Sequence, residues 1–157
     1  MGQEIERKFL VAGESWRENV RSSVRIRQGY VARADAAVVR VRQIEGAAAF
    51  LTVKSTQPGL VRAEFEYEIP PADAEALLRE ACAAPLIVKL RHHLDWKGKA
   101  WVVDEFEAAL AGLVLAEVEL DSANEAVDIP TWAAREVTDD PAYRNDALAR
   151  SLRKTLD

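Results

Sequence analysis

Apolar and charged side chains alternate with a period of two along most of this 157-residue chain. Successive side chains of a β-strand point to opposite faces of a sheet, so this alternation predicts strands with one apolar and one charged face. Turn signals such as Glu45-Gly46, Gln57-Pro58-Gly59 and Lys97-Gly98-Lys99 separate several of the segments. We therefore expect strands at about residues 2–11, 24–34, 37–45, 48–56, 61–69, 86–96, 99–107 and 114–121.

Three further segments have the composition of helices. Residues 15–21 begin with Ser15 as a candidate N-cap, residues 72–83 follow two prolines and are rich in Ala, Leu and Glu, and residues 141–155 carry an apolar stripe. Antiparallel strands with short connections can remove their exposed edges by closing on themselves. The sequence therefore predicts a mainly β protein of the α+β type. We expect an eight-stranded, closed antiparallel β-barrel with a few peripheral helices, in a single domain over residues 1–157.

Composition narrows the class of protein. Hydrophobic residues make up 49% and charged residues 30%, which is typical of a globular chain, and no apolar run approaches the roughly 20 residues of a transmembrane helix. The first residues are charged where a signal peptide would be apolar, so we expect a cytoplasmic protein without a membrane partner. The net charge of −5 argues against a nucleic-acid partner. The single cysteine, Cys82, excludes an internal disulfide and a cysteine-based zinc site.

The charged faces of the expected strands are segregated by sign. Residues 39–42 put two arginines on one face of a strand, whereas residues 115–119 put two glutamates there. Any single strand of this kind is best explained as an ordinary sheet face in water, but the pattern recurs in at least six strands. If the sheet closes with these charges inward, they must be matched by one another or by a ligand, because an unpaired buried ion costs several kcal/mol.

The two kinds of charge suit different parts of one ligand. Arginine presents forked donors to phosphate oxygens and lysine a compact charge, so the cationic strands favour a polyanion. Carboxylates in the same cavity would repel a phosphate unless a hard cation such as Mg²⁺ or Mn²⁺ lay between them. Carboxylates and metal on one side of a phosphate, with arginine and lysine on the other, form an arrangement suited to phosphoryl transfer.

The opening segment, Glu4-Ile5-Glu6-Arg7-Lys8, carries an ExExK pattern. Further motifs follow in order: Gln28-Gly29-Tyr30, Val39-Arg40-Val41-Arg42, Leu51-Thr52-Val53-Lys54, Glu64-Phe65-Glu66-Tyr67-Glu68-Ile69-Pro70, Lys89-x-Arg91, Trp101-x-x-Asp104, Leu115-Ala116-Glu117-Val118-Glu119, Glu136-Val137-Thr138 and Tyr143-x-Asn145. In these motifs, which cover nearly the whole chain, the sequence resembles the CYTH superfamily, also called triphosphate tunnel metalloenzymes. The resemblance implies an eight-stranded tunnel that binds a triphosphate together with a divalent metal.

The resemblance also implies roles for individual residues. The metal-side carboxylates would be Glu4, Glu6, Glu64, Glu66, Asp104, Glu117 and Glu119. The phosphate-binding residues would be Lys8, Arg40, Arg42, Lys54, Arg62, Lys89 and Arg91. Tyr30 and Lys89 are candidate catalytic partners, because a lysine among other cations has a lowered pKa and could accept a proton. The alternative for Tyr30 is a structural tyrosine at a strand end. Arg7 points to the opposite face and is expected to be structural.

Hydrolysis of a triphosphate, with inorganic tripolyphosphate as the substrate, is the leading hypothesis among the activities of this superfamily. A class IV adenylate cyclase would differ in its nucleophile, a ribose hydroxyl in place of water, and would also need an adenine pocket. A thiamine triphosphatase would need aromatic stacking, for which Trp16, Trp96, Trp101 and Trp132 are available. A non-catalytic polyphosphate-binding module is disfavoured because all the motif carboxylates are present. An apolar outer sheet face left uncovered by helices would favour a homodimer.

Overall fold

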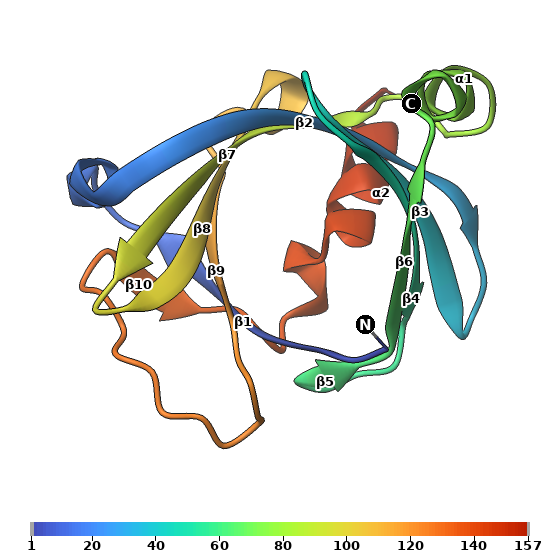
Figure 1. The fold of residues 1–157 in the computed structure, drawn as a ribbon. Helices are drawn as coiled ribbons and strands as arrows, with labels where there is room; N and C mark the ends of the chain where they lie inside the picture. Colours follow the sequence, from blue (N-terminus) through green and yellow to red (C-terminus); the bar gives the residue numbers. More distant parts are fainter. Residues whose placement is uncertain (1, 157) are drawn as a thin grey trace.

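The computed structural model describes the backbone of residues 2–156 and the side chains of residues 2–151. Its main feature is a strongly curved antiparallel sheet that surrounds a central space (Figure 1). The strands are β1 (Glu4–Val11), β2 (Val20–Arg33), β3 (Ala37–Ile44), β4 (Ala49–Ser55), β5 (Val61–Arg62), β6 (Glu64–Ile69), β7 (Ile87–Trp96), β8 (Lys99–Phe106), β9 (Val114–Glu119) and β10 (Ala133–Glu136). The helices are α1 (Pro71–Glu80) and α2 (Asn145–Leu156), with short 3-10 helices η1 (Ser15–Asn19), η2 (Ala108–Leu110) and η3 (Pro141–Tyr143).

The sheet is mainly antiparallel β, as expected, but it is not a closed eight-stranded barrel. Its strands lie in the order β10-β1-β9-β8-β7-β2-β3-β4-β6, and β5 pairs only with β1. The expected strand 61–69 divides at Ala63, because β6 pairs with β4 over six residue pairs whereas β5 meets β1 over two. The backbones of Gly2 and Glu64 add two hydrogen bonds, of 2.9 and 3.3 Å, across the same seam. This overlap is too short to continue the sheet into a barrel.

The tenth strand was not expected from the sequence. β10 has four residues without a clear period-two pattern, so its pairing with β1 rests on tertiary structure. Arg7 of β1 donates two hydrogen bonds, of 2.9 and 2.6 Å, to the carboxylate of Glu136 in this strand. That pair confirms that Arg7 lies on the face opposite to Glu6 and Lys8, with a structural partner.

Helices occur in all three expected segments, with different bounds. The first is a short 3-10 helix in which Ser15 is the first residue and Glu14 precedes it without a side-chain cap. Pro71 occupies the first turn of α1, where its missing N–H leaves no donor unpaired. The last segment is divided into η3 and α2, and the Asp140 carboxylate accepts a 3.0 Å hydrogen bond from the Ala142 backbone N–H at the start of η3.

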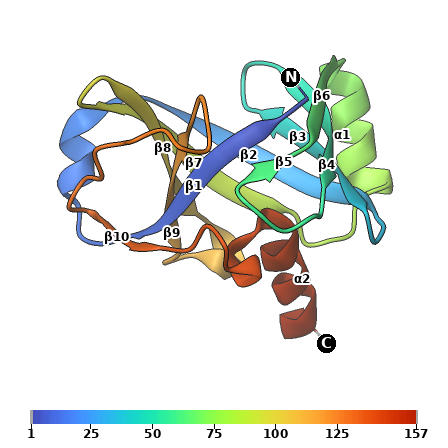
Figure 2. The same ribbon diagram turned by 90° about the horizontal axis from the view of Figure 1, so that it is seen from below.

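Most of the apolar core lies on the outer face of the sheet. α1 covers part of that face, where Ala74 and Leu78 pack with Val41 and Ala49 of β3 and β4 (Figure 2). A second cluster lies over β1, β8 and β9, and Trp101 and Trp132 meet there edge to face at 5.5 Å. Helices and loops thus bury the apolar face and leave the charged face turned toward the central space.

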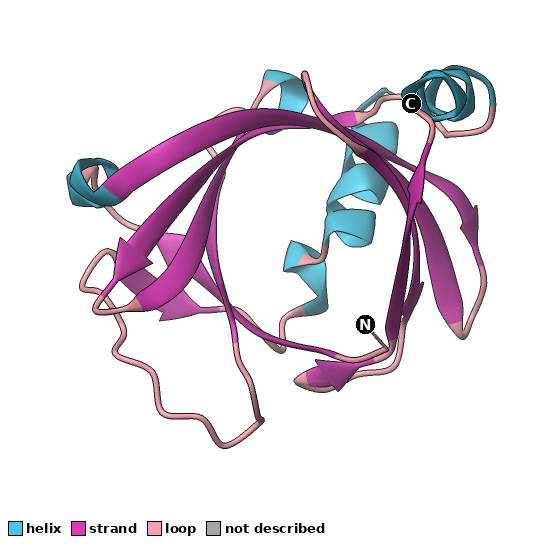
Figure 3. Ribbon diagram, in the orientation of Figure 1, coloured by secondary structure: helices cyan, strands magenta, loops and turns pink. Residues whose placement is uncertain are grey.

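α2 is seen inside the ring of strands in Figures 1 and 3, and Figure 2 shows that it lies at one end of this central space. Its Leu148 is buried with Ile87, Phe106 and Leu115 of the sheet. The polar start of α2 therefore faces the charged interior. Among the described residues, the helices are all too short or too polar to cross a bilayer.

Candidate active site

Charged side chains of the inner sheet face line two adjoining cavities. The larger, here called the carboxylate chamber, has a volume of about 380 Å³. Its charged lining is Glu4, Glu6, Glu64, Glu66, Glu117 and Glu119, with Arg40, Arg42, Lys54 and Arg91. The smaller, here called the cationic chamber, has a volume of about 80 Å³ and lies at the α2 end. Its cations are Lys8, Arg33, Arg40, Lys54, Arg62, Arg144 and Arg150. Arg40, Lys54 and Asn145 line both chambers, so a ligand that spans them would pass these three side chains.

The strand register explains why carboxylates and cations alternate around the chambers. On β1 and β9, Glu6 lies opposite Glu119 and Lys8 lies opposite Glu117. Since residues two apart share a face, these two pairs stack along the interior. The cations Arg40 of β3 and Lys54 of β4 are placed in the same way. Arg40 lies opposite Thr52 of β4, and Lys54 lies opposite Val38 of β3.

Lys54 and Arg62 hold the carboxylates at one wall of the site. The Lys54 ammonium lies 2.5 Å from a carboxylate oxygen of Glu4 and 3.4 Å from one of Glu64. The Arg62 guanidinium lies 3.7 Å from Glu4 and 3.6 Å from Glu6. All five side chains are at most 21% exposed, so these pairs are only weakly screened by solvent.

A second group joins β3, β4 and β6. The Glu66 carboxylate accepts hydrogen bonds from Arg42 at 3.2 Å and from the Thr52 hydroxyl at 2.9 Å, and the Arg40 guanidinium lies 3.7 Å away. Burial and the neighbouring charge of Arg40 lower the pKa of Arg42 to about 10. The two arginines therefore share one carboxylate, so each guanidinium keeps N–H groups that could bind a further anion.

Glu6 and Glu117 show how crowded the negative charge is. Burial and the charge of Glu117 raise the pKa of Glu6 to about 7. Burial alone would also raise the pKa of Glu117, but the charges of Lys8 and Arg91 outweigh it and lower that pKa to about 2. The Lys8 ammonium lies 3.4 Å and the Arg91 guanidinium 3.7 Å from Glu117. The chamber thus holds more carboxylate than its own cations neutralise.

The donor set of the carboxylate chamber fits a hard divalent cation. Six glutamates line it, and oxygen donors of this kind suit Mg²⁺ or Mn²⁺. Burial and the charge of Glu117 raise the pKa of Glu6, and a nearby cation would favour its charged form. Among the described side chains, however, no three carboxylates already converge in a metal-binding geometry, since the carboxylates are directed toward lysine and arginine. A cation would therefore have to displace some of these ion pairs.

Asp104 and Lys89 lie beside the chambers rather than in their lining. Asp104 is 1% exposed; its carboxylate lies 2.8 Å from the Lys89 ammonium and accepts hydrogen bonds of 2.7 and 2.8 Å from Arg91. Burial would raise the pKa of Asp104, but these two cations outweigh it and lower that pKa. Burial and the neighbouring charge of Arg91 outweigh the attraction of Asp104 and lower the pKa of Lys89 to about 8. This geometry gives Asp104 two protein cations as partners, in contrast to the metal-side role expected from the sequence.

Tyr30 lines the cationic chamber at the point where β2 bends. The β2–β3 register shifts between Tyr30 and Ala32, which is a bulge that re-aims the strand. Burial raises the pKa of Tyr30, and its hydroxyl interacts with Arg40. Among the described residues no hydrogen bond joins Tyr30 to Lys89, so the expected pairing of these two is not present in this structure.

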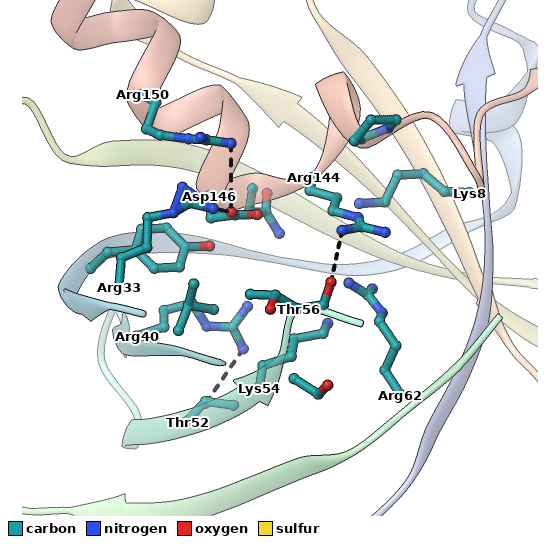
Figure 4. Close-up of a pocket in the computed structure, with 15 residues that line it drawn as sticks. Lys8, Arg33, Arg40, Thr52, Lys54, Thr56, Arg62, Arg144, Asp146 and Arg150 are labelled. Atoms are coloured by element: carbon teal, nitrogen blue, oxygen red, sulfur yellow. Dashed lines mark hydrogen bonds and ion pairs between the residues drawn. The ribbon is translucent and has the colours of Figure 1, made fainter. Parts of the chain in front are cut away.

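Four charged residues that line the cationic chamber were not among the expected site residues: Arg33, Arg144, Asp146 and Arg150 (Figure 4). Arg150 lies 3.9 Å from Asp146, and its side chain is 58% exposed. Arg144 donates a 3.4 Å hydrogen bond to the backbone carbonyl of Thr56. The signal that could have found them is the i, i+4 spacing of Asp146 and Arg150 beside the Tyr143-x-Asn145 motif.

The comparison with protein-family models agrees with the motifs. The model described as CYTH domain matches residues 2–148. This chain belongs to the CYTH family. An inorganic triphosphatase of Acetivibrio thermocellus is 42% identical over 156 residues, which cover 99% of both chains. An inorganic triphosphatase of Nitrosomonas europaea is 37% identical over 153 residues, which cover 95% of this chain and 98% of the other.

A solved structure resembles the fold as well. The crystal structure of the inorganic triphosphatase NE1496 superposes with a TM-score of 0.67, at 36% identity, over 93% of this CYTH chain and 97% of that chain. The expected family is thus confirmed, with the ExExK segment of the family on β1, where Glu4, Glu6 and Lys8 all face the interior.

Proposed function

We propose that this CYTH protein is a metal-dependent triphosphatase that hydrolyses inorganic tripolyphosphate to pyrophosphate and phosphate. The observation that supports it most is the contact between the two chambers, since Arg40 and Lys54 line both. A triphosphate lying across that boundary would have one end among carboxylates and the other among cations. Two relatives at 42% and 37% identity are named inorganic triphosphatase, which favours the same substrate here.

The carboxylate end would hold Mg²⁺ or Mn²⁺. Glu4, Glu6, Glu117 and Glu119 are the proposed ligands, directly or through water, and Glu64 and Glu66 lie within the same chamber. When bound, the divalent cation would polarise a phosphoryl oxygen and lower the pKa of a bound water. It would also offset the mutual repulsion of Glu6 and Glu117, which line the same chamber.

The cations would bind and orient the phosphate chain. Lys8, Arg40, Arg42, Lys54, Arg62 and Arg91 are the proposed phosphate ligands. In hydrolysis, water forms a bond to the terminal phosphorus, the bond from that phosphorus to the bridging oxygen breaks, and pyrophosphate leaves with the electron pair. Arginine and lysine around the bridging oxygen would stabilise the charge that develops there. We assign Asp104 and Lys89 a positioning role, in which Asp104 orients Arg91 toward Glu117 and the chamber.

Phosphate release tests this proposal. Tripolyphosphate, ATP and pyrophosphate are each incubated with Mg²⁺, Mn²⁺ or EDTA, and ATP reactions are also assayed for cyclic AMP. We expect release from tripolyphosphate with either metal and none with EDTA. No metal-dependent release from any of the three would overturn the hydrolase, whereas cyclic AMP from ATP would establish a cyclase instead.

We also propose a homodimer through the outer face of β5 and β6. Val61, Phe65 and Tyr67 are 38%, 44% and 53% exposed there, whereas α1 covers only the neighbouring part of the sheet. Sedimentation at micromolar concentration measures the mass directly, and a monomer at that concentration would contradict this assembly.

A further inference from the structure

The far end of the cationic chamber is bounded by an acidic residue. Asp146, in the first turn of α2, is the one acidic side chain among the described residues that line this chamber. Its carboxylate is paired with Arg33 and lies 3.9 Å from Arg150. Asp146 is 14% exposed, so these ion pairs are only weakly screened by solvent. An anion that reached this end of the chamber would meet two arginines that are already engaged by a carboxylate.

A third cavity begins on the other side of Asp146. This outer recess has a volume of about 450 Å³ and lies between β2, residues 80–85 and α2. It shares Tyr30, Arg33, Val38, Asp146 and Arg150 with the cationic chamber. The three cavities therefore follow one another: the carboxylate chamber, the cationic chamber, and the outer recess behind Arg33 and Asp146.

This sequence of cavities gives the bound phosphate chain a direction. The carboxylates that suit a metal are at the first cavity, and Arg40 and Lys54 mark its boundary with the second. A chain that extended beyond the cationic chamber at this end would pass Asp146 and enter the outer recess. Figure 4 shows Arg33 and Arg150 converging on Asp146 from one side, while Lys8, Arg62 and Arg144 lie toward the other.

We propose that Asp146 sets the upper length of the phosphate chain that this site accepts, by holding Arg33 and Arg150 in ion pairs at the boundary between the cationic chamber and the outer recess, where a fourth phosphate would need them. The inference rests on the proposed triphosphatase function. While these ion pairs are made, neither guanidinium is free to bind a longer chain. Replacing the Asp146 carboxylate would release both arginines as phosphate ligands.

The test compares linear tetrapolyphosphate with tripolyphosphate as substrates, with Mg²⁺ present. The measured quantity is the ratio of their kcat/KM values, in which the fraction of active enzyme cancels. We expect Asp146→Asn and Asp146→Ala each to raise the ratio at least fivefold. Asp146→Glu keeps the charge and serves as the matched control, so its ratio should stay within threefold of the wild type.

Arg33→Gln separates the loss of the ion pair from the release of an arginine. It breaks the pair between Arg33 and Asp146 but supplies no free guanidinium, so the ratio should not rise. An increase below fivefold in both Asp146→Asn and Asp146→Ala, or an equal increase in Arg33→Gln, would overturn the inference. If the wild type hydrolyses neither substrate, the proposed function fails separately, and the same ratio is then taken from calorimetric Kd values of the two polyphosphates.

Discussion

At the scale of single residues, Lys54 lies at the junction of the two chambers. It contacts Glu4 and Glu64 on the carboxylate side and also lines the cationic chamber. The period-two pattern predicted that Lys54 would share a face with Thr52, and the motif predicted phosphate binding. What the pattern could not give is the ion pair with Glu4, because that contact joins strands 50 residues apart in the chain.

Replacing Lys54 tests its role at the junction of the chambers. We expect Lys54→Ala to lower kcat/KM for tripolyphosphate about tenfold or more, since a charge that stabilises the phosphate chain is lost. Arg27→Ala is the matched control, because Arg27 pairs with Glu75 on the outer face. Steady-state kinetics should show a change below twofold in this control, and equal losses in the two variants would contradict the assignment.

Glu6, a proposed metal ligand, is expected to make the free energy of unfolding of the metal-free protein depend on pH. Its pKa is raised from 4.5 to about 7 in the folded protein, so folding favours the protonated form. The resulting stability is fully present below pH 4.5 and is lost as the pH rises through 7, by on the order of 3 kcal/mol. Glutamine resembles the protonated acid.

Denaturation in EDTA therefore distinguishes Glu6→Gln from the wild type in a pH-dependent way. At pH 8 we expect the variant to be more stable than the wild type, and at pH 4.5 the difference should vanish. A variant that is less stable at pH 8 would show that Glu6 is not under electrostatic strain in the metal-free protein.

At the scale of elements, the local sequence pattern predicts the strands. It does not predict the short junction between β1 and β5, where the sheet fails to close. Eight segments were predicted within a few residues because alternation is a local signal. The division of residues 61–69 depends on which neighbours flank each part, β1 for Val61 and Arg62 and β4 for the rest. The pairing of β10 and the inward position of the start of α2 likewise depend on tertiary contacts. Neither a four-residue strand nor a polar helix face has a local sequence pattern that predicts such contacts.

The buried pair between β7 and β8 should be worth far more than an exposed pair between β1 and β10. Asp104→Ala leaves Lys89 and Arg91 without their carboxylate at a site that is 1% exposed, so we expect a loss of about 3–5 kcal/mol in the free energy of unfolding. Glu136→Ala removes a partly exposed partner of Arg7 and should cost less than about 1 kcal/mol. Urea denaturation measures both, and similar losses would refute the difference in burial as the cause.

At the scale of the whole molecule, the chain divides its chemistry between two faces of one curved sheet. The outer face packs against α1 and a tryptophan cluster, and the inner face gathers six glutamates next to a group of lysines and arginines. The sequence predicted this division and the residues on each side. It did not predict that the cations would form a separate chamber bounded by α2, since Arg33 and Asp146 lie 113 residues apart.

The central claim is that metal and phosphate occupy adjoining chambers, and a crystal of the complex tests it most directly. Crystals grown with Mn²⁺ and imidotriphosphate, which resists hydrolysis, are measured for anomalous scattering. We predict a manganese peak in the carboxylate chamber beside Glu4, Glu6, Glu117 and Glu119, and phosphate density that reaches Arg40 and Lys54. A manganese peak outside this chamber, or an anion bound away from the inner face, would contradict the account.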